Sequence, residues 1–159
     1  MEFDYGPNPL QGAGPIIETD IGIADAHKAL LERQGLPVPP PIRCRFLIDT
    51  GASKSLVKHE IAERAGLKLI NDSSPVHGIG VDTTGKTYFG RIWFRCKSKQ
   101  VHGVQHTIGI DAQISSATLT QKMDLIDGLI GRDVLRFFEL RYNGFEGNFS
   151  LRFLQPRHP

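Results

Sequence analysis

One segment restricts the fold of this chain more than any other, because three apolar residues, Phe46-Leu47-Ile48, run directly into the ionisable Asp49. An apolar run of this kind, bounded by turn residues, predicts a buried strand over Cys44–Ile48. Burying a carboxyl group at its end is costly unless hydrogen bonds or shared protons compensate. Thr50 supplies a hydroxyl group, and Gly51 lets the backbone turn sharply enough to aim N–H groups at the carboxylate. The segment therefore predicts an oriented carboxylate at the end of a buried strand.

Short β-branched and aromatic segments, separated by glycine and proline, make up most of the remaining pattern. Further strands are expected over Ile16–Ile23, Leu67–Ile70, Gly90–Lys97, Val104–Ala112 and a closing hairpin, Glu139–Tyr142 with Phe149–Leu154. A long hairpin is expected over Val76–Phe94, with its turn in Asp82–Lys86. Helices are expected over Ala26–Gln34, Leu56–Ala65 and Arg132–Phe138, with Asp25 capping the first and Gly35 ending it. Many short strands and few helices predict an all-β, closed β-barrel-like architecture.

The length of 159 residues favours one domain, because a second hydrophobic core would leave each half near the lower limit of independent stability. Residues 1–14 are rich in glycine, proline and asparagine and are expected to be a flexible N-terminal arm. Residues 15–159 are expected to form the single domain. No run approaches the length of a membrane span, and a formal charge of +2, spread along the chain, predicts binding to neither nucleic acid nor membranes.

The two cysteines, Cys44 and Cys96, both lie in expected strands. Two cysteines do not make a disulfide framework, so we interpret both as reduced thiols, with a single bridge as the alternative. The N-terminus lacks a basic region followed by an apolar run, so no secretory signal is expected. These features predict a cytoplasmic protein.

A second informative segment follows eighty residues beyond Gly51, where Asp127-Gly128-Leu129-Ile130-Gly131 leads into Arg132-Asp133-Val134-Leu135. Together, "LIDTGAS", the glycine-containing stretch "HGIGVDTTGKTYFGRI" and "LIGRDVL", in this order and spacing, resemble the retropepsin-like aspartic proteases. The resemblance implies a barrel-like acid protease fold in which the segment around Ile130 and Gly131 braces the active-site loop. It also implies that the central hairpin is a flap over a substrate cleft.

The resemblance assigns candidate roles to individual residues. The catalytic group comprises Asp49, Thr50 and Gly51, and structural support comes from Gly131, Arg132 and Asp133. Substrate-binding candidates are Ala52 and Ser53 after the catalytic residues and Gly78, Ile79 and Gly80 in the flap. These flap residues could equally be ordinary hairpin residues. The resemblance implies no metal and no cofactor.

A single Asp49 supplies half of the carboxyl pair that the family's mechanism requires. The second "DT", at Asp82-Thr83-Thr84-Gly85, is no second site, because an extra threonine intervenes and no apolar strand precedes it. The resemblance therefore implies a C₂ homodimer that pairs two Asp49 side chains and hydrolyses peptide bonds in a polypeptide substrate. The alternatives are a non-catalytic dimerisation or peptide-binding module with the same fold, and autoprocessing of a larger precursor.

Two features depart from the retroviral pattern. Retroviral members usually carry aspartate where this chain has Ser53, and that aspartate pairs with the arginine that matches Arg132. We therefore expect Arg132 to bond elsewhere, within its own loop. The long C-terminal hairpin is more similar to the end of a pepsin lobe than to the short retroviral strand.

A zinc site built on Cys96, His102 and His106 is the remaining alternative. It is disfavoured, because a turn at His102-Gly103 would separate ligands that a zinc ion needs to converge.

Overall fold

Strand β3 (Ile42–Ile48) illustrates how the sequence builds the fold, because its residues alternate between the interior and the outer surface. Cys44, Phe46 and Ile48 are buried, whereas Arg43 and Arg45 are exposed. This alternation is the period of two that a strand shows when one face of its sheet covers a core. The computed structural model describes residues 2–7, 13–78, 81–97, 105–117 and 125–154.

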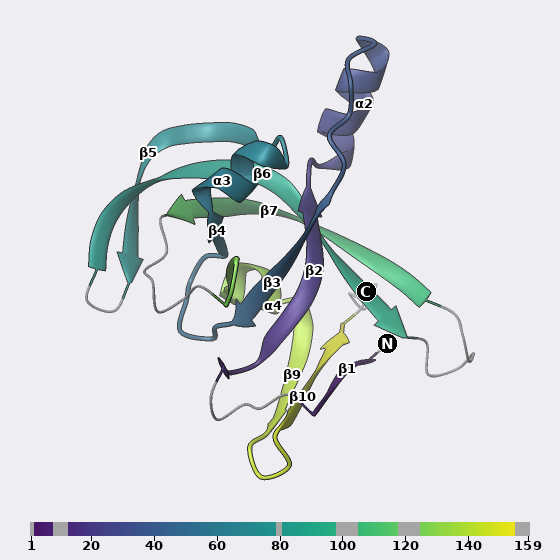
Figure 1. Cartoon of the computed structure of the whole chain (residues 1–159), viewed down its shortest axis with the longest axis vertical. Helices are drawn as coiled ribbons and strands as arrows, with labels where there is room; N and C mark the ends of the chain where they lie inside the picture. The colour runs from purple at the N-terminus through teal and green to yellow at the C-terminus, as the bar shows by residue number, and fades with distance from the viewer. Residues whose placement is uncertain (1, 8–12, 79–80, 98–104, 118–124, 155–159) are drawn as a thin grey trace, which may run out of the picture.

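Six strands close into a barrel around this core (Figure 1). In order around the wall they are β2 (Ile16–Gly22), β3, β8 (Gly128–Ile130), β4 (Leu56–Lys58), β7 (Gln105–Ala117) and β6 (Val81–Lys97). The pairing of β6 with β2, which sets Ile21 opposite Ile92, completes the ring. Strand β5 (Lys68–Gly78) pairs with the first half of β6, on the same edge that β2 contacts farther along and opposite the edge paired with β7. The expected all-β, closed-barrel architecture is confirmed.

A separate antiparallel sheet lies beside the barrel, with its strands in the order β1 (Glu2–Pro7), β10 (Asn148–Phe153) and β9 (Phe138–Asn143) (Figure 1). The expected C-terminal hairpin is present, and Phe149 and Leu151 of β10 are buried in the same core as the barrel residues. Strand β1 pairs along the edge of β10 that would otherwise be open. A strand thus occupies residues 2–7 of the segment that we expected to be a flexible arm.

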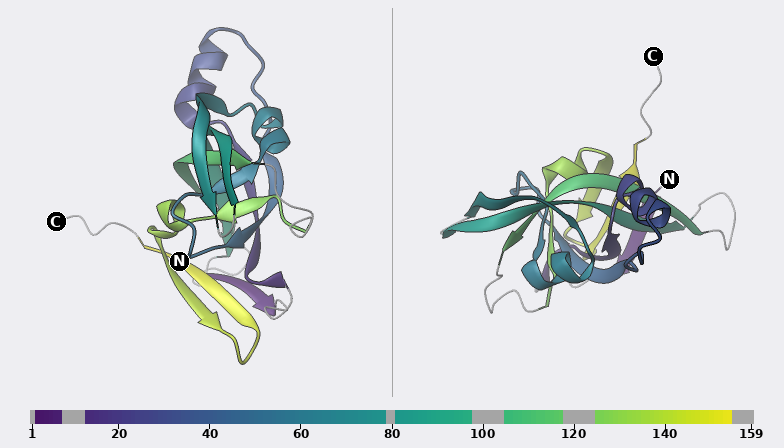
Figure 2. Two further views of the ribbon diagram at one scale, coloured as in Figure 1. Left: turned by 90° about the vertical axis from the view of Figure 1, so that its left-hand side faces the viewer. Right: turned by 90° about the horizontal axis from the view of Figure 1, so that it is seen from above.

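Helix α2 (Asp25–Arg33) has no buried residue and projects from the barrel (Figure 2). The predicted cap is wrong, because Asp25 is the first helical residue and its carboxylate pairs with Arg91, while Ala24 occupies the N-cap position without a side-chain hydrogen bond. The predicted end is confirmed, since Gly35 follows the helix with φ of 65°. No helix in the described part of the chain is long and apolar enough to cross a membrane.

The other two helices are shorter than the sequence pattern predicts. Leu56–Lys58 forms strand β4, and the helix α3 (His59–Arg64) begins only after it. Leu56 pairs with residues of both β7 and β8, so backbone hydrogen bonding from two neighbours overrides the helical spacing of the apolar residues. Helix α4 (Arg132–Leu135) ends before Phe138, because Phe138 begins β9.

The long hairpin is present, but its expected turn is wrong. Asp82–Lys86 lies within β6, and Asp82 pairs with His77 of β5. The strands meet where Gly78 pairs with Val81. The β-branched residues between Val81 and Lys86 favour a strand, which outweighs the turn tendency of Asp82 and Gly85.

The core joins residues from both sheets and from the helices α3 and α4. Its largest fully buried side chains are Phe46, Phe94, Phe149, Ile17, Ile21, Ile92, Ile114, Ile130 and Leu151. The tilted ring pair of Phe94 with Phe138, with centroids 4.8 Å apart, links the barrel wall to the second sheet. This shared core holds the two sheets in one packed unit.

Both cysteines are buried free thiols, as expected. Burial raises the pKa of the Cys44 thiol to about 12 and also raises the pKa of the Cys96 thiol. Because the thiolate is the reactive form, we expect iodoacetamide at neutral or mildly alkaline pH to leave both residues unlabelled in the folded protein. Mass spectrometry measures the labelling, and urea-unfolded protein, labelled at both residues, is the control. Rapid labelling of folded protein would contradict the assignment.

The same burial predicts how stability responds to alkaline pH. In the folded protein the pKa of the Cys44 thiol is about 12, whereas the ordinary pKa of a cysteine thiol is 9.0. The thiol therefore stays protonated to a higher pH in the folded state than in the unfolded chain. Its contribution to the free energy of unfolding is therefore complete below about pH 9 and declines as pH rises toward 12. Urea unfolding measured from pH 9 to pH 12 should show a smaller decline in the free energy of unfolding for Cys44→Ala than for the wild type. Equal declines would contradict the prediction.

Candidate active site

The carboxylate of Asp49 is held at the end of β3 by the backbone of its own loop. The N–H groups of Gly51 and Ala52 donate to Asp49 Oδ1 at 2.8 and 3.2 Å. The backbone N–H of Asp49 in turn donates to the carbonyl of Ile130 at 3.0 Å. These bonds fix the plane of a half-buried carboxylate and leave Oδ2 without a hydrogen bond to any residue that the structure describes. The oriented carboxylate predicted from the sequence is thus present in the structure.

Strand β8 supports the loop that follows Asp49. It pairs in parallel with the end of β3, with Ile48 beside Ile130, and antiparallel with β4. Gly131 follows directly, and a Cβ on it would lie 2.6 Å from the backbone carbonyl of Lys54. Only glycine permits this approach, so the chain after β8 passes against the backbone of the loop between Asp49 and β4. The expected brace is therefore observed.

Arg132 binds the active-site loop directly, and its expected bonding within its own loop is wrong. Its Nη1 donates to the carbonyls of Thr50 and Gly51 at 2.8 and 2.9 Å, and its backbone N–H donates to the carbonyl of Ala52 at 2.9 Å. A guanidinium group offers several donors in a fixed plane, which suits neighbouring carbonyls as well as a carboxylate. Ser53 is exposed and contributes nothing to this contact among the interactions that the structure describes.

Ser55 is a supporting residue that the sequence analysis missed. Its hydroxyl donates to Asp133 Oδ1 at 2.8 Å and accepts the N–H of Gly131 at 3.0 Å. Its backbone N–H also donates to Asp133 Oδ1, at 2.9 Å, and the serine is fully buried. These bonds join the end of the active-site loop to the start of α4. The available sequence signal was a small polar residue directly before the apolar pair Leu56-Val57.

Removing this hydroxyl is expected to destabilise the protein. Ser55→Ala leaves the N–H of Gly131 without its acceptor and takes one donor from Asp133 in a buried site, which costs about 1–3 kcal/mol in the free energy of unfolding. Urea unfolding at a fixed protein concentration measures the difference. Ser53→Ala is the matched control, because Ser53 is exposed in the same loop. Equal losses in the two variants would show that the Ser55 bonds contribute nothing specific.

The structure therefore brings together the loop residues Asp49, Thr50, Gly51 and Ala52 with Gly131, Arg132 and Asp133. The flap candidates are described only in part. Gly78 is the last residue of β5, and Ile79 and Gly80 lie outside the described residues.

No group of three or more histidine, cysteine, aspartate or glutamate side chains could hold a metal ion within the described ranges. Of the residues weighed for a zinc site, Cys96 is buried, His106 is exposed, and His102 lies outside those ranges. The chemical centre of the arrangement around Asp49 is a carboxylate positioned by backbone groups.

Comparison with known proteins agrees with this arrangement. The family profile described as aspartyl protease matches residues 41–134, which include both Asp49 and Gly131. A crystal structure of a retropepsin-like aspartic protease from Rickettsia conorii superimposes with a TM-score of 0.50, covering 96% of this chain and 91% of that chain at 15% identity. Among curated proteins, none matches the sequence. Because the family profile spans more than half of the chain and the fold is shared, this protein belongs to the aspartyl protease family and is retropepsin-like.

Proposed function

We propose that the protein is a homodimeric aspartic endopeptidase that cleaves extended polypeptide with a pair of Asp49 carboxyl groups, one from each chain. One observation carries the proposal: backbone N–H groups hold Asp49 Oδ1 in the loop, while Oδ2 makes no hydrogen bond to a described residue. An oriented carboxylate with one unengaged oxygen is the form that general acid–base chemistry requires. Membership of the aspartyl protease family supports peptide hydrolysis as the reaction.

The second chain is needed because two carboxyl groups must share one proton. The other Asp-Thr sequence, which begins at Asp82, lies within strand β6 and is paired with β5, so it offers no second loop of this kind. A twofold axis beside Asp49 would bring identical carboxyl groups together. Two such groups in contact repel each other when both are ionised, so the pair shares one proton.

Hydrolysis then follows from the two protonation states. The ionised Asp49 takes a proton from a bound water as the water oxygen attacks the scissile carbonyl carbon, and the protonated Asp49 gives its proton to the carbonyl oxygen. In the second half, the carboxyl that took the water proton delivers it to the leaving nitrogen as the C–N bond breaks. The other carboxylate recovers a proton from the tetrahedral intermediate. One water is consumed, and the pair returns to its starting state.

The β5–β6 hairpin is the element that we assign to substrate binding. Its strands run past the barrel to the pair Gly78 and Val81, which fits a flap over a cleft (Figure 1). Substrate would bind as an added strand through its backbone, with side-chain pockets selecting the sequence. Ala52, Ser53, Gly78, Ile79 and Gly80 remain the proposed substrate-binding residues.

Subunit mixing tests the shared site. Wild type and Asp49→Asn are mixed in equal amounts, equilibrated, and assayed on a proteome-derived peptide library from acid to neutral pH. If each active site needs one Asp49 from each chain, only dimers of two wild-type chains cleave. The mixture then has about a quarter of the activity of wild-type protein at the same total concentration. Independent sites would retain half, which would overturn the shared-site mechanism.

Two controls complete the experiment. Mixing wild type with Asp25→Asn should leave activity unchanged, because Asp25 lies on the projecting helix α2. Sedimentation velocity should show a dimer at the assay concentration. A strict monomer would overturn the paired mechanism. A library left uncut by wild type at every pH would instead establish a non-catalytic module.

A further inference from the structure

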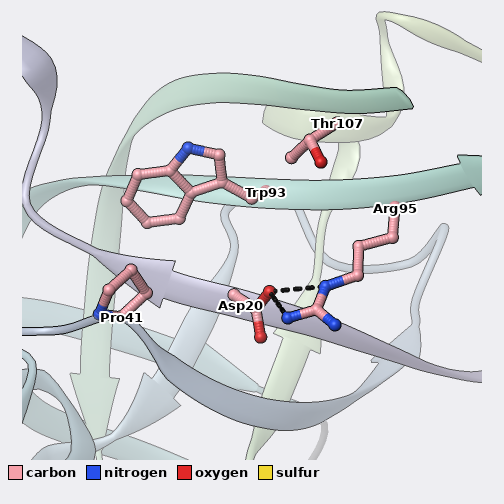
Figure 3. Close-up of a pocket in the computed structure, with 5 residues that line it drawn as sticks. All are labelled: Asp20, Pro41, Trp93, Arg95 and Thr107. Atoms are coloured by element: carbon pink, nitrogen blue, oxygen red, sulfur yellow. Dashed lines mark hydrogen bonds and ion pairs between the residues drawn. The ribbon is translucent and has the colours of Figure 1, made fainter. Parts of the chain in front are cut away.

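An open cavity lies on the outer face of the barrel, where β2, β6 and β7 run side by side. Its volume is about 360 Å³, and Asp20, Pro41, Trp93, Arg95 and Thr107 line it (Figure 3). The lining residues belong to none of the contacts that position Asp49. The volume is near the lower end for small-molecule sites, enough for one ring and its substituents.

Trp93 supplies a flat apolar surface, and two glycines allow it to lie close to the sheet. A Cβ on Gly22 would lie 3.1 Å from the indole Cζ3, and a Cβ on Gly109 would lie 3.3 Å from Cδ1. Gly109 is the partner of Trp93 on β7, and Asp20 is its partner on β2. Trp93 is nevertheless only half-buried, so part of the ring faces the cavity (Figure 3). A planar ligand can stack on such a surface.

Arg95, two residues after Trp93 on β6, supplies a positioned positive charge to the same cavity. Its Nε and Nη2 both donate to Asp20 Oδ2, at 2.8 and 2.6 Å (Figure 3). The Asp20 side chain is only 13% exposed, so its carboxylate restrains the position of the Arg95 guanidinium group. Arg43 also reaches Asp20, at 3.4 Å, and Arg43 rather than Arg95 pairs with Glu18.

These bonds occupy one edge of the Arg95 guanidinium group. The edge between Nη1 and Nη2 has no second partner among the described residues, and half of the side chain is exposed. A guanidinium edge of this kind binds a carboxylate through two parallel hydrogen bonds. The cavity therefore combines a stacking surface with an available carboxylate-binding edge.

We propose that this cavity binds an aromatic carboxylate, with its ring on Trp93 and its carboxylate on the free edge of Arg95. The ring of Pro41 adds an apolar wall, and the hydroxyl of Thr107 adds a hydrogen-bonding group on the opposite strand. The site is separate from the proposed protease function and does not depend on it.

Fluorescence provides a direct test, because Trp93 is the chain's single tryptophan. N-acetyl-L-phenylalanine, which does not absorb under tryptophan-selective excitation, should change the emission of the full-length protein in a saturable manner. N-acetyl-L-phenylalanine amide lacks the charge and N-acetylglycine lacks the ring. Each should need at least about tenfold higher concentration for half-saturation. No saturable change with the first probe, or equal binding of all three, would overturn the proposal.

Variants then locate the binding. Arg95→Gln should raise the half-saturating concentration of N-acetyl-L-phenylalanine about tenfold and leave that of the amide unchanged. Arg141→Gln is the matched control, since Arg141 is an exposed arginine paired with Glu139 on the second sheet. Asp49→Asn should bind the probe as the wild type does, so a failure of this site is distinguishable from a failure of the protease function. An unchanged half-saturation in Arg95→Gln would overturn the assignment.

Discussion

Asp49→Asn is expected to lower kcat/KM for peptide hydrolysis by at least about a thousandfold, because the amide can neither accept the proton of the attacking water nor supply one to the leaving group. The fold should survive. The backbone bonds from Gly51 and Ala52 reach Oδ1, and the amide oxygen of asparagine can accept both. Initial rates on a cleaved library peptide measure the loss, and thermal unfolding measures the stability of the same preparation.

Asp25→Asn is the matched control, since it makes the same chemical change in an exposed residue that pairs with Arg91. Its activity should equal that of the wild type. Residual cleavage by Asp49→Asn within about tenfold of the wild type would show that the carboxyl group is not the general acid–base. A large drop in the melting temperature would show that the activity was lost through unfolding.

Gly128→Ala is expected to cause a larger loss of stability than Ser55→Ala. A Cβ at this position would lie 2.2 Å from the backbone carbonyl of Leu56 and 2.6 Å from the ring of Phe46. Gly128 pairs with Phe46 on one side and with Val57 on the other, so neither neighbour can move without breaking the barrel wall. We expect a loss of about 3 kcal/mol or more in the free energy of unfolding. The melting temperature should fall by several degrees.

Urea and thermal unfolding at one fixed protein concentration measure this loss, since the proposed dimerisation would make apparent stability depend on concentration. Gly144→Ala is the matched control, because its Cβ would meet only the ring of the exposed Tyr142, at 3.3 Å. That variant should stay within about 0.5 kcal/mol of the wild type. Similar losses in both variants would show that close packing at β8 is not the cause.

The parts of the fold and site that the sequence predicts best are those set by local chemistry. The apolar run before Asp49 specifies a strand, and Gly51 directly after Thr50 specifies the tight turn whose N–H groups bind the carboxylate. Such features need no knowledge of the rest of the chain.

The errors arise where distant partners decide the structure. Leu56–Lys58 has helical spacing but becomes a strand because β7 and β8 lie on either side. Arg132, which we expected to bond within its own loop, binds the carbonyls of Thr50 and Gly51 instead. Ser55 is an ordinary serine until Asp133 and Gly131 surround it. Each outcome depends on a contact across about sixty to eighty residues of sequence, which local patterns do not encode.

The parallel pairing of β3 with β8 also affects when the protein becomes competent during synthesis. The loop that carries Asp49 emerges early, but the strand beneath it and Arg132 are translated about eighty residues later. Contacts of such long range form late and slowly, because a large loop must close first. A nascent chain would therefore carry Asp49 in an unsupported loop until the segment with β8 and Arg132 had been synthesised. The proposed peptide cleavage would begin only after this segment had folded against the loop.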